Sequence, residues 1–175
     1  MAGPAQDAEL VGRCRAGDPH AWDELVERYS RYVHAIAVQG YRLKGADAED
    51  AFQEVFLRVY ERLGSLRNPE SLRPWIAQLT RRVCLDRLAA LGREEPAELA
   101  LEEAEAVVGE IDEAFSVREA MAQLSEECRE VLDRFFCRDE SYRTIGEALG
   151  LPSGTIASRI SRCLGKLRER FEQAG

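Results

Sequence analysis

The clearest chemical pattern in the chain is a row of basic side chains near its C-terminal end. Their spacing of three, four and four residues places them on one side of a helix: Arg159, Arg162, Lys166 and Arg170. Short side chains stand before or between them, at Thr155, Ala157, Ser158 and Ser161. Arginine and lysine contact DNA phosphates, and short side chains can approach base edges in the major groove. The pattern predicts a DNA-binding helix, with an ordinary solvated basic face as the alternative.

The residues before this face have the turn chemistry of a helix-turn-helix. Ser141 can cap a first helix, Gly150 can take the left-handed conformation at its end, and Leu151 can fill the corner. Ser153 can then cap the second helix. The inward positions of that second helix are expected at Ile156, Ile160, Leu164 and Leu167.

An acidic and polar face is expected on a helix in the first half of the chain. This helix begins at about Asp47, and its apolar stripe is Phe52, Val55, Phe56, Val59 and Leu63. The opposite face carries Asp50, Gln53, Glu54, Leu57, Arg58 and Glu61. Such a face suits a basic protein partner, although a merely solvated surface has the same composition.

A block of arginines follows, around a loop that contains prolines. Its members are Arg67, Arg73, Arg81, Arg82 and Arg87, with Trp75 among them. Loop groups and aromatic rings can stack on unpaired bases while arginines contact phosphates, so the block is a candidate for binding single-stranded nucleic acid. Trp75 taken alone is expected to belong to the core.

The elements that must position these residues are helices. Apolar residues recur at intervals of three and four, and the alternation typical of strands is nearly absent. One helix is expected to start at Asp18 and Pro19, and another to run from about Pro74 to Leu91. A second helical unit is expected to begin near Ile111, with a helix on Phe115, Val117 and Met121, and Ser125 is expected to cap the next helix. Between residues 65 and 74, two prolines and several turn formers predict a loop or a short turn.

The charge distribution divides the chain. Residues 94–119 hold ten acidic side chains and one basic one, which exceeds the whole net charge of −8. The part from 94 to 110 has no wide apolar face and is interpreted as a linker with at most partial helix. We therefore predict an all-α fold of two small helical domains, residues 1–93 and 111–175. The acidic linker 94–110 joins them, and the C-terminal domain contains the helix-turn-helix.

Several classes of protein are disfavoured by composition. No apolar run approaches the length of a membrane span, and the first residues lack the pattern of a signal peptide, so a cytoplasmic location is expected. Five cysteines without a Cys-x-x-Cys pair argue against disulfides and zinc, and Cys84 and Cys163 are expected to be small apolar residues. A redox role for the cysteines stays open as an alternative. No catalytic residue, metal site or cofactor is predicted.

Taken together, these runs resemble the sigma-70 family of bacterial RNA polymerase sigma factors. The resemblance is to the extracytoplasmic-function (ECF) group, which keeps only regions 2 and 4. Residues 47–56 are similar to the region 2 helix that docks on the clamp helices of the polymerase. Residues 75–88 are similar to the helix that engages the minus-10 promoter element with the preceding loop, and residues 141–162 to the region 4 motif that reads the minus-35 element.

The resemblance implies three sets of site residues. Polymerase would be bound by Asp47, Glu49, Asp50, Gln53 and Glu54. The minus-10 element, with a base flipped into the loop, would be bound by Arg67, Asn68, Ser71, Arg81, Arg82 and Arg87. The minus-35 element would be bound by Thr155, Ala157, Ser158, Arg159, Ser161, Arg162 and Lys166. The acidic linker would thread toward the active centre of the polymerase.

The implied function is that of a promoter-specificity subunit, which is not an enzyme. Its partners would be bacterial core RNA polymerase, promoter DNA and an anti-sigma factor that holds it in reserve. The alternative is a stand-alone helix-turn-helix regulator, which would bind duplex DNA tightly without polymerase. Arg82, Ala89 and Ala157 depart from residues common in the family, so the promoter sequence is not transferred from relatives.

Overall fold

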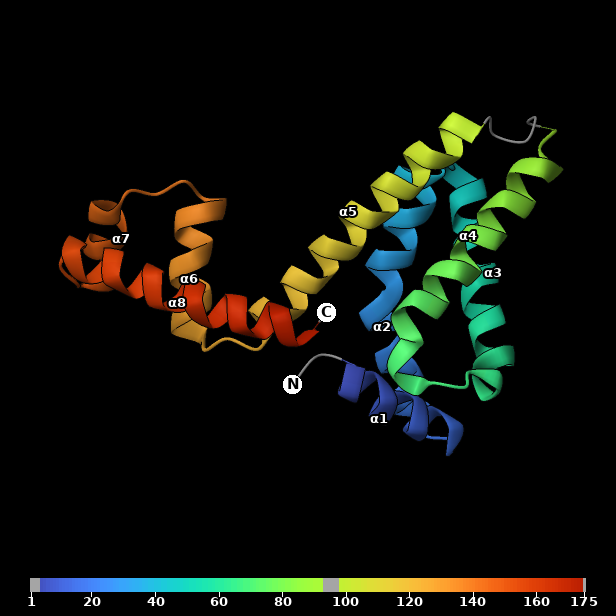
Figure 1. Cartoon of the computed structure of the whole chain (residues 1–175), viewed down its shortest axis with the longest axis horizontal. Coiled ribbons are helices and arrows are strands. Elements are labelled where there is room, and N and C mark those ends of the chain that lie inside the picture. Colours follow the sequence, from blue (N-terminus) through green and yellow to red (C-terminus); the bar gives the residue numbers. More distant parts are fainter. Residues whose placement is uncertain (1–3, 93–97, 175) are drawn as a thin grey trace. The chain divides into compact units, whose positions relative to one another are not determined.

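The computed structural model describes residues 4–92 and 98–174, and all regular structure in these ranges is helical (Figure 1). The α-helices are α1 (Pro4–Arg15), α2 (Pro19–Ala35), α3 (Gly45–Arg62), α4 (Leu72–Ala90), α5 (Glu98–Ala122), α6 (Glu126–Leu132), α7 (Tyr142–Leu149) and α8 (Ser153–Ala174). Two compact units separate within α5: an N-terminal unit, Pro4–Phe115, and a C-terminal unit from Ser116 onward. The predicted all-α class with two small helical domains is confirmed.

Local sequence signals set the first turn of α2. Asp18 is its N-cap and accepts a hydrogen bond from the backbone N–H of His20 at 3.0 Å, while Pro19 occupies the first helical position. Tyr29 and Val33 are fully buried on its inner face. α2 continues into a π-helical turn, Ile36–Gly40.

The first helix of the unit has no counterpart in the sequence prediction. Leu10, Val11 and Cys14 are buried on one side of α1. The hydroxyl of Tyr29 donates a hydrogen bond to a carboxylate oxygen of Asp7 at 2.8 Å. The same carboxylate pairs with Arg28, so a buried polar contact fastens α1 to α2.

The structure differs from the predicted linker over residues 94–110. Residues 98–110 form the first part of α5, and residues 93–97 lie outside the described residues. One side of α5 packs against the core of the N-terminal unit through Ala104, Val108, Ile111 and Phe115. These positions recur at intervals of four, three and four and form a narrow apolar stripe along one side of an otherwise acidic helix. This stripe is the side that packs against the core. The N-terminal unit therefore extends to Phe115, beyond the predicted limit at 93.

The C-terminal unit has a small core beneath α8. Its buried residues are Leu124, Cys128, Val131, Leu132, Ile145, Ile156, Ile160 and Cys163. Ser125 caps α6 and Ser141 caps α7, as predicted, each accepting a hydrogen bond from a backbone N–H three residues on.

Glycine shapes the turn between α7 and α8. Gly150 ends α7 with a positive φ of 67°, which confirms the predicted left-handed cap. A Cβ on Gly146 would lie 2.4 Å from the carbonyl oxygen of Leu151, so the close approach of this turn requires glycine. α8 begins at Ser153 itself, where the sequence predicts a cap, and the carbonyl of Pro152 accepts from the N–H groups of Thr155 and Ile156.

The prediction that the cysteines form no disulfide is wrong for one pair. Cys128 of α6 and Cys163 of α8 are joined, with their Cα atoms 5.4 Å apart. Proximity comes from the packing of the two helices across 35 residues of sequence, which spacing alone does not reveal. Cys14, Cys84 and Cys137 are free, and the expected burial of Cys84 is confirmed.

Candidate functional site

The acidic face of α3 lies on the surface of the N-terminal unit. Glu49, Asp50 and Gln53 are exposed, whereas Asp47 and Glu54 are half-buried. Leu57 is also exposed, at 52%. The opposite side of the helix supplies Val55, Val59 and Leu63 to the core, with Phe52 and Phe56 partly buried beside them.

Two acids on this face, Asp50 and Glu54, are already paired with basic side chains of the same unit. Asp50 forms an ion pair with Arg87 of α4 at 3.2 Å. Glu54 pairs with Arg58 at 2.8 Å, and this hydrogen bond is the main cause that raises the pKa of Arg58. Arg58 also reaches Asp86 of α4 at 3.4 Å. The face is a network of both charges that spans α3 and α4, a feature that the spacing on α3 alone does not show.

The loop between α3 and α4 is held in shape by hydrogen bonds of its own. The side-chain oxygen of Asn68 accepts from the N–H of Glu70 at 3.2 Å, and its amide donates to the hydroxyl of Ser71 at 3.1 Å. Short 3₁₀ turns, Leu63–Ser65 and Pro69–Ser71, flank the exposed side chain of Arg67. Thus Arg67, Asn68 and Ser71 lie on one compact loop.

Arg15 is a contributor to this loop that the sequence analysis missed. Its guanidinium, at the end of α1, donates hydrogen bonds to the carbonyl oxygens of Leu63 and Leu66. Buried Leu66 anchors the same segment to the core. The only sequence signal is a basic residue in the last turn of α1, where it also suits the helix dipole.

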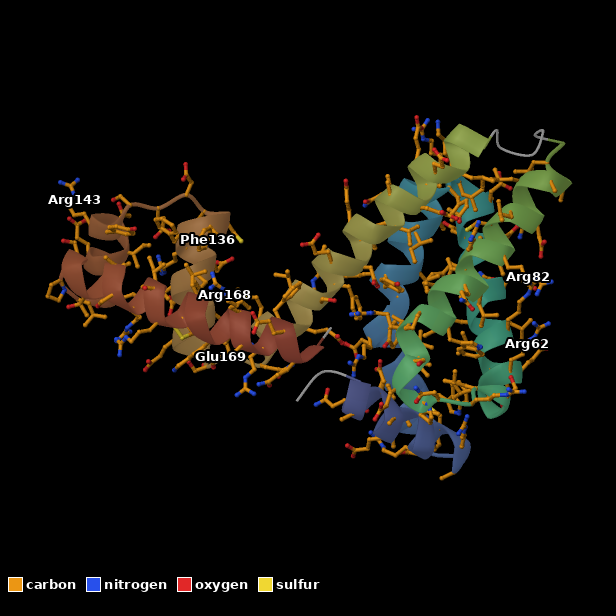
Figure 2. All side chains as sticks on the ribbon, viewed as in Figure 1. Arg62, Arg82, Phe136, Arg143, Arg168 and Glu169 are labelled. Carbon is orange, nitrogen blue, oxygen red and sulfur yellow. A yellow bond between two sulfur atoms is a disulfide. The ribbon has the colours of Figure 1, made fainter. Side chains whose placement is uncertain are left out.

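The arginines of α4 divide into two groups. Three of them have acidic partners within the unit: Arg73 with Asp112, Arg81 with Glu105 and Arg87 with Asp50. Arg82 is exposed and has no ion-pair partner among the described residues, and the same holds for Arg67. Figure 2 shows Arg82 and Arg62 at the edge of the unit away from α5. Trp75 packs against the core, as expected.

The helix-turn-helix face lies on α8 in the C-terminal unit. Ser158, Ser161, Arg162 and Lys166 are exposed, and Thr155, Ala157 and Arg159 are half-buried at its edge. The predicted inward position of Leu164 is wrong, because its side chain is 38% exposed and Cys163 takes the place in the core. Ile156, Ile160 and Cys163 follow at intervals of four and three, the helical repeat of the buried side.

Three of the basic residues line a cavity of about 160 Å³ between α6 and α8. Its lining residues are Ser125, Glu127, Cys128, Arg159, Arg162, Cys163 and Lys166. The cavity therefore brings together predicted DNA contacts and both cysteines of the disulfide. Arg168 lies on the same helix outside this lining (Figure 2).

Comparison with known proteins identifies both units. Residues 25–94 match the family model described as Sigma-70 region 2, and residues 120–169 match Sigma-70, region 4. The chain belongs to the sigma-70 family. Region 2 of this sigma factor thus contains the acidic face of α3, the loop and α4, and region 4 contains the helix-turn-helix.

Curated relatives are named as RNA polymerase sigma factors. The ECF RNA polymerase sigma factor SigM of Mycobacterium tuberculosis is 30% identical over 92% of this chain and 82% of its own length. The RNA polymerase sigma-H factor of Pseudomonas aeruginosa is 29% identical over 97% of this chain and 93% of its own. The ECF RNA polymerase sigma-E factor of Escherichia coli is 28% identical over 93% of this chain and 92% of its own length.

No helix within residues 4–92 and 98–174 is long and apolar enough to span a membrane. Within those same ranges, His, Cys, Asp and Glu side chains form no group of three that could hold a metal ion.

Proposed function

We propose that this sigma factor is a promoter-specificity subunit that binds bacterial core RNA polymerase through region 2 and promoter DNA through both regions. One observation carries the proposal. An exposed acidic face and a basic helix-turn-helix face occur on separate folded units, in the order of regions 2 and 4. The protein acts by binding and orienting its partners and carries out no chemistry of its own.

Polymerase docking would use Asp47, Glu49, Asp50, Gln53 and Glu54 of α3. A basic partner surface would compete with Arg87 for Asp50 and with Arg58 for Glu54. Exposed ion pairs contribute little stability, up to about 1 kcal/mol each, so this exchange costs little. Docking would also release Arg87 for contact with DNA.

The minus-10 element would meet Arg67, Asn68 and Ser71 of the loop and Arg81, Arg82 and Arg87 of α4. Arg67 and Arg82 are available at once, whereas Arg81 must exchange Glu105 for a phosphate. A flipped base would replace the hydrogen bond between Asn68 and Ser71 with bonds to its own edge. Such contacts have to return the few kcal/mol that unstacking a base requires.

The minus-35 element would be read by α8. Ala157, Ser158 and Ser161 would approach base edges, where the methyl group of Ala157 suits contact with thymine. Thr155, Arg159, Arg162 and Lys166 would contact phosphates and position the helix in the groove.

The acidic stretch 98–110 supports a further part of the proposal. It would leave the N-terminal core and occupy a basic channel of the polymerase, because its carboxylates mimic the charge of RNA. An anti-sigma factor would hold the protein in reserve until a signal arrives, and the protein would act in the cytoplasm, where its partners are.

The test measures binding to duplex promoter DNA with and without core polymerase. We expect promoter-specific complexes only in the presence of polymerase. Arg162→Gln should weaken the complex and lower the dependence on salt by about one phosphate contact, whereas Arg168→Gln should change it much less. Tight, sequence-specific binding by the free protein, with no effect of polymerase, would support a stand-alone regulator instead.

A further inference from the structure

The disulfide of the C-terminal unit lies directly beneath its DNA-facing side. Cys128 is in the first turn of α6 and Cys163 is in the middle of α8, three residues before Lys166. Both cysteines are almost fully buried, at 4% and 2% exposure. The cross-link therefore joins the helix that carries the predicted minus-35 contacts to the helix that supports it.

The 160 Å³ cavity lies beside both cysteines. Its charged lining consists of Arg159, Arg162 and Lys166 against the single acid Glu127. Surroundings with an excess of positive charge favour the approach of anions over cations. The volume exceeds that of a single water molecule, so part of a small solute can enter.

The other cysteines have different surroundings. Burial raises the pKa of the Cys14 thiol to about 11 and that of the Cys84 thiol to about 12. Both therefore stay protonated and inert near neutral pH. Cys137 is exposed and lies in the C-terminal unit, outside the lining of the cavity. Only the Cys128–Cys163 pair, among the described residues, combines a disulfide with a basic cavity.

We propose that the Cys128–Cys163 disulfide is a thiol–disulfide exchange site for a small thiol that carries negative charge and enters through the basic cavity. The thiolate of this thiol attacks one cysteine sulfur, forms a mixed disulfide and releases the other cysteine as a thiolate. A second thiolate attacks the mixed disulfide, releases the remaining cysteine and leaves as the oxidised small disulfide. Two electrons pass to the protein, and the two cysteine thiolates take protons from water.

Exchange at this site and DNA binding use the same side chains. This part of the inference rests on the proposed function, in which Arg159, Arg162 and Lys166 hold phosphates. A phosphate backbone on those residues covers the cavity, so bound DNA protects the disulfide from reduction. Reduction in turn removes the bond between α6 and α8, so it loosens the support of the DNA-facing helix.

The experiment follows reduction of the full chain carrying Cys137→Ser, which prevents exchange with the exposed thiol. Glutathione serves as the negatively charged thiol and cysteamine as the positively charged one, with rate constants expressed per thiolate. Mass spectrometry after alkylation counts the free cysteines and detects the mixed disulfide. We expect reduction by glutathione to be roughly fivefold faster or more, an advantage that high salt removes.

A matched pair of variants locates the effect. Arg162→Gln should slow reduction by glutathione and leave the rate with cysteamine unchanged or higher, whereas Arg168→Gln should alter neither. Equal rate constants for the two thiols, with no effect of salt or of Arg162→Gln, overturn the proposal. So does the finding that Cys128 and Cys163 are free thiols in protein purified in air.

The DNA part has its own readout. A promoter complex with core polymerase should slow reduction of the disulfide by glutathione. If the preference for glutathione holds and the promoter complex gives no protection, the exchange site stands and the assignment of this face to DNA phosphates fails.

Discussion

The two units of the molecule hold their helices together in different ways. The N-terminal unit buries a large apolar cluster from α1 to α5, and it keeps Cys14 and Cys84 as free thiols within it. The C-terminal unit has a small cluster, and two of its buried residues are cross-linked cysteines. A short chain segment buries too little apolar surface to be very stable by itself. The difference indicates that covalent support replaces core volume beneath α8.

The largest expected effect comes from removing this cross-link. The double variant Cys128→Ser, Cys163→Ser should lower the stability of the C-terminal unit by roughly 3 to 4 kcal/mol, because the disulfide closes a loop across 35 residues. Hydrogen exchange resolved along the chain would measure it, with Cys137→Ser as the control. Equal loss of protection in α2 and α3 would contradict the independence of the two units.

The next effect concerns glycine in the helix-turn-helix. Gly146→Ala should destabilise the C-terminal unit by about 1 to 3 kcal/mol, because the added Cβ meets the backbone of Leu151. Gly165→Ala, on α8 with open space around it, should instead stabilise the helix by about 0.5 to 1 kcal/mol. Denaturant unfolding measures the change in stability of each variant. A change of the same sign in both variants would contradict the close contact between Gly146 and the carbonyl oxygen of Leu151.

A smaller effect is expected from the loop of the N-terminal unit. Arg15→Ala removes hydrogen bonds to the carbonyls of Leu63 and Leu66 and should cost about 1 kcal/mol. The rate of hydrogen exchange at the backbone amides of residues 66–68 should rise. Promoter melting by the holoenzyme should slow. Arg13→Ala is the matched control, since Arg13 pairs with Asp18 and Glu24 outside the loop. If both variants raised exchange there equally, the anchoring role of Arg15 would be wrong.

A pH-dependent effect separates the units by their thiols. The pKa values of Cys14 and Cys84 are raised in the folded protein, so the unfolded chain releases these protons first. Stability of the N-terminal unit should therefore fall as the pH rises from about 9 toward 11 or 12. Burial also raises the pKa of Tyr32 and of Tyr41, which adds to the fall at higher pH.

Urea unfolding at pH 8 and pH 10 checks this prediction. The variant Cys14→Ala, Cys84→Ala should show a shallower fall between these values than the unmodified protein. The disulfide-bonded cysteines of the C-terminal unit bind no proton and contribute no such dependence. An identical slope with and without the two thiols would contradict the assignment.

Local signals in the sequence predicted the elements with clear caps. Asp18, Ser125 and Ser141 begin helices because a short polar side chain satisfies nearby N–H groups, and this depends on adjacent residues only. The later part of α5, from Ile111, was predicted as a helix, whereas the part before it was interpreted as a linker because its acidic composition hid the narrow stripe of Ala104, Val108, Ile111 and Phe115. A count of apolar spacing over 98–122 would have found it.

Features that depend on distant parts of the chain could not be predicted. The disulfide requires α6 and α8 to pack so that the Cα atoms of Cys128 and Cys163 lie 5.4 Å apart. The ion pair of Asp50 with Arg87 requires α3 to lie along α4. Leu164 and Cys163 are neighbours in sequence, and the helix phase decided which one is buried. Residue types on a single helix revealed the candidate faces, while tertiary packing determined which charges are already paired.

The central claim is that region 2 of this sigma factor docks on core RNA polymerase through the acidic face of α3. The most direct test compares binding of the unmodified protein with that of the double variant Asp50→Lys, Glu54→Lys. Asp23→Lys, Glu27→Lys is the control, because it reverses two exposed acids at the same spacing on α2. We expect at least about tenfold weaker binding for the first variant and little change for the control. Equal affinity of all three proteins for the polymerase would contradict the claim.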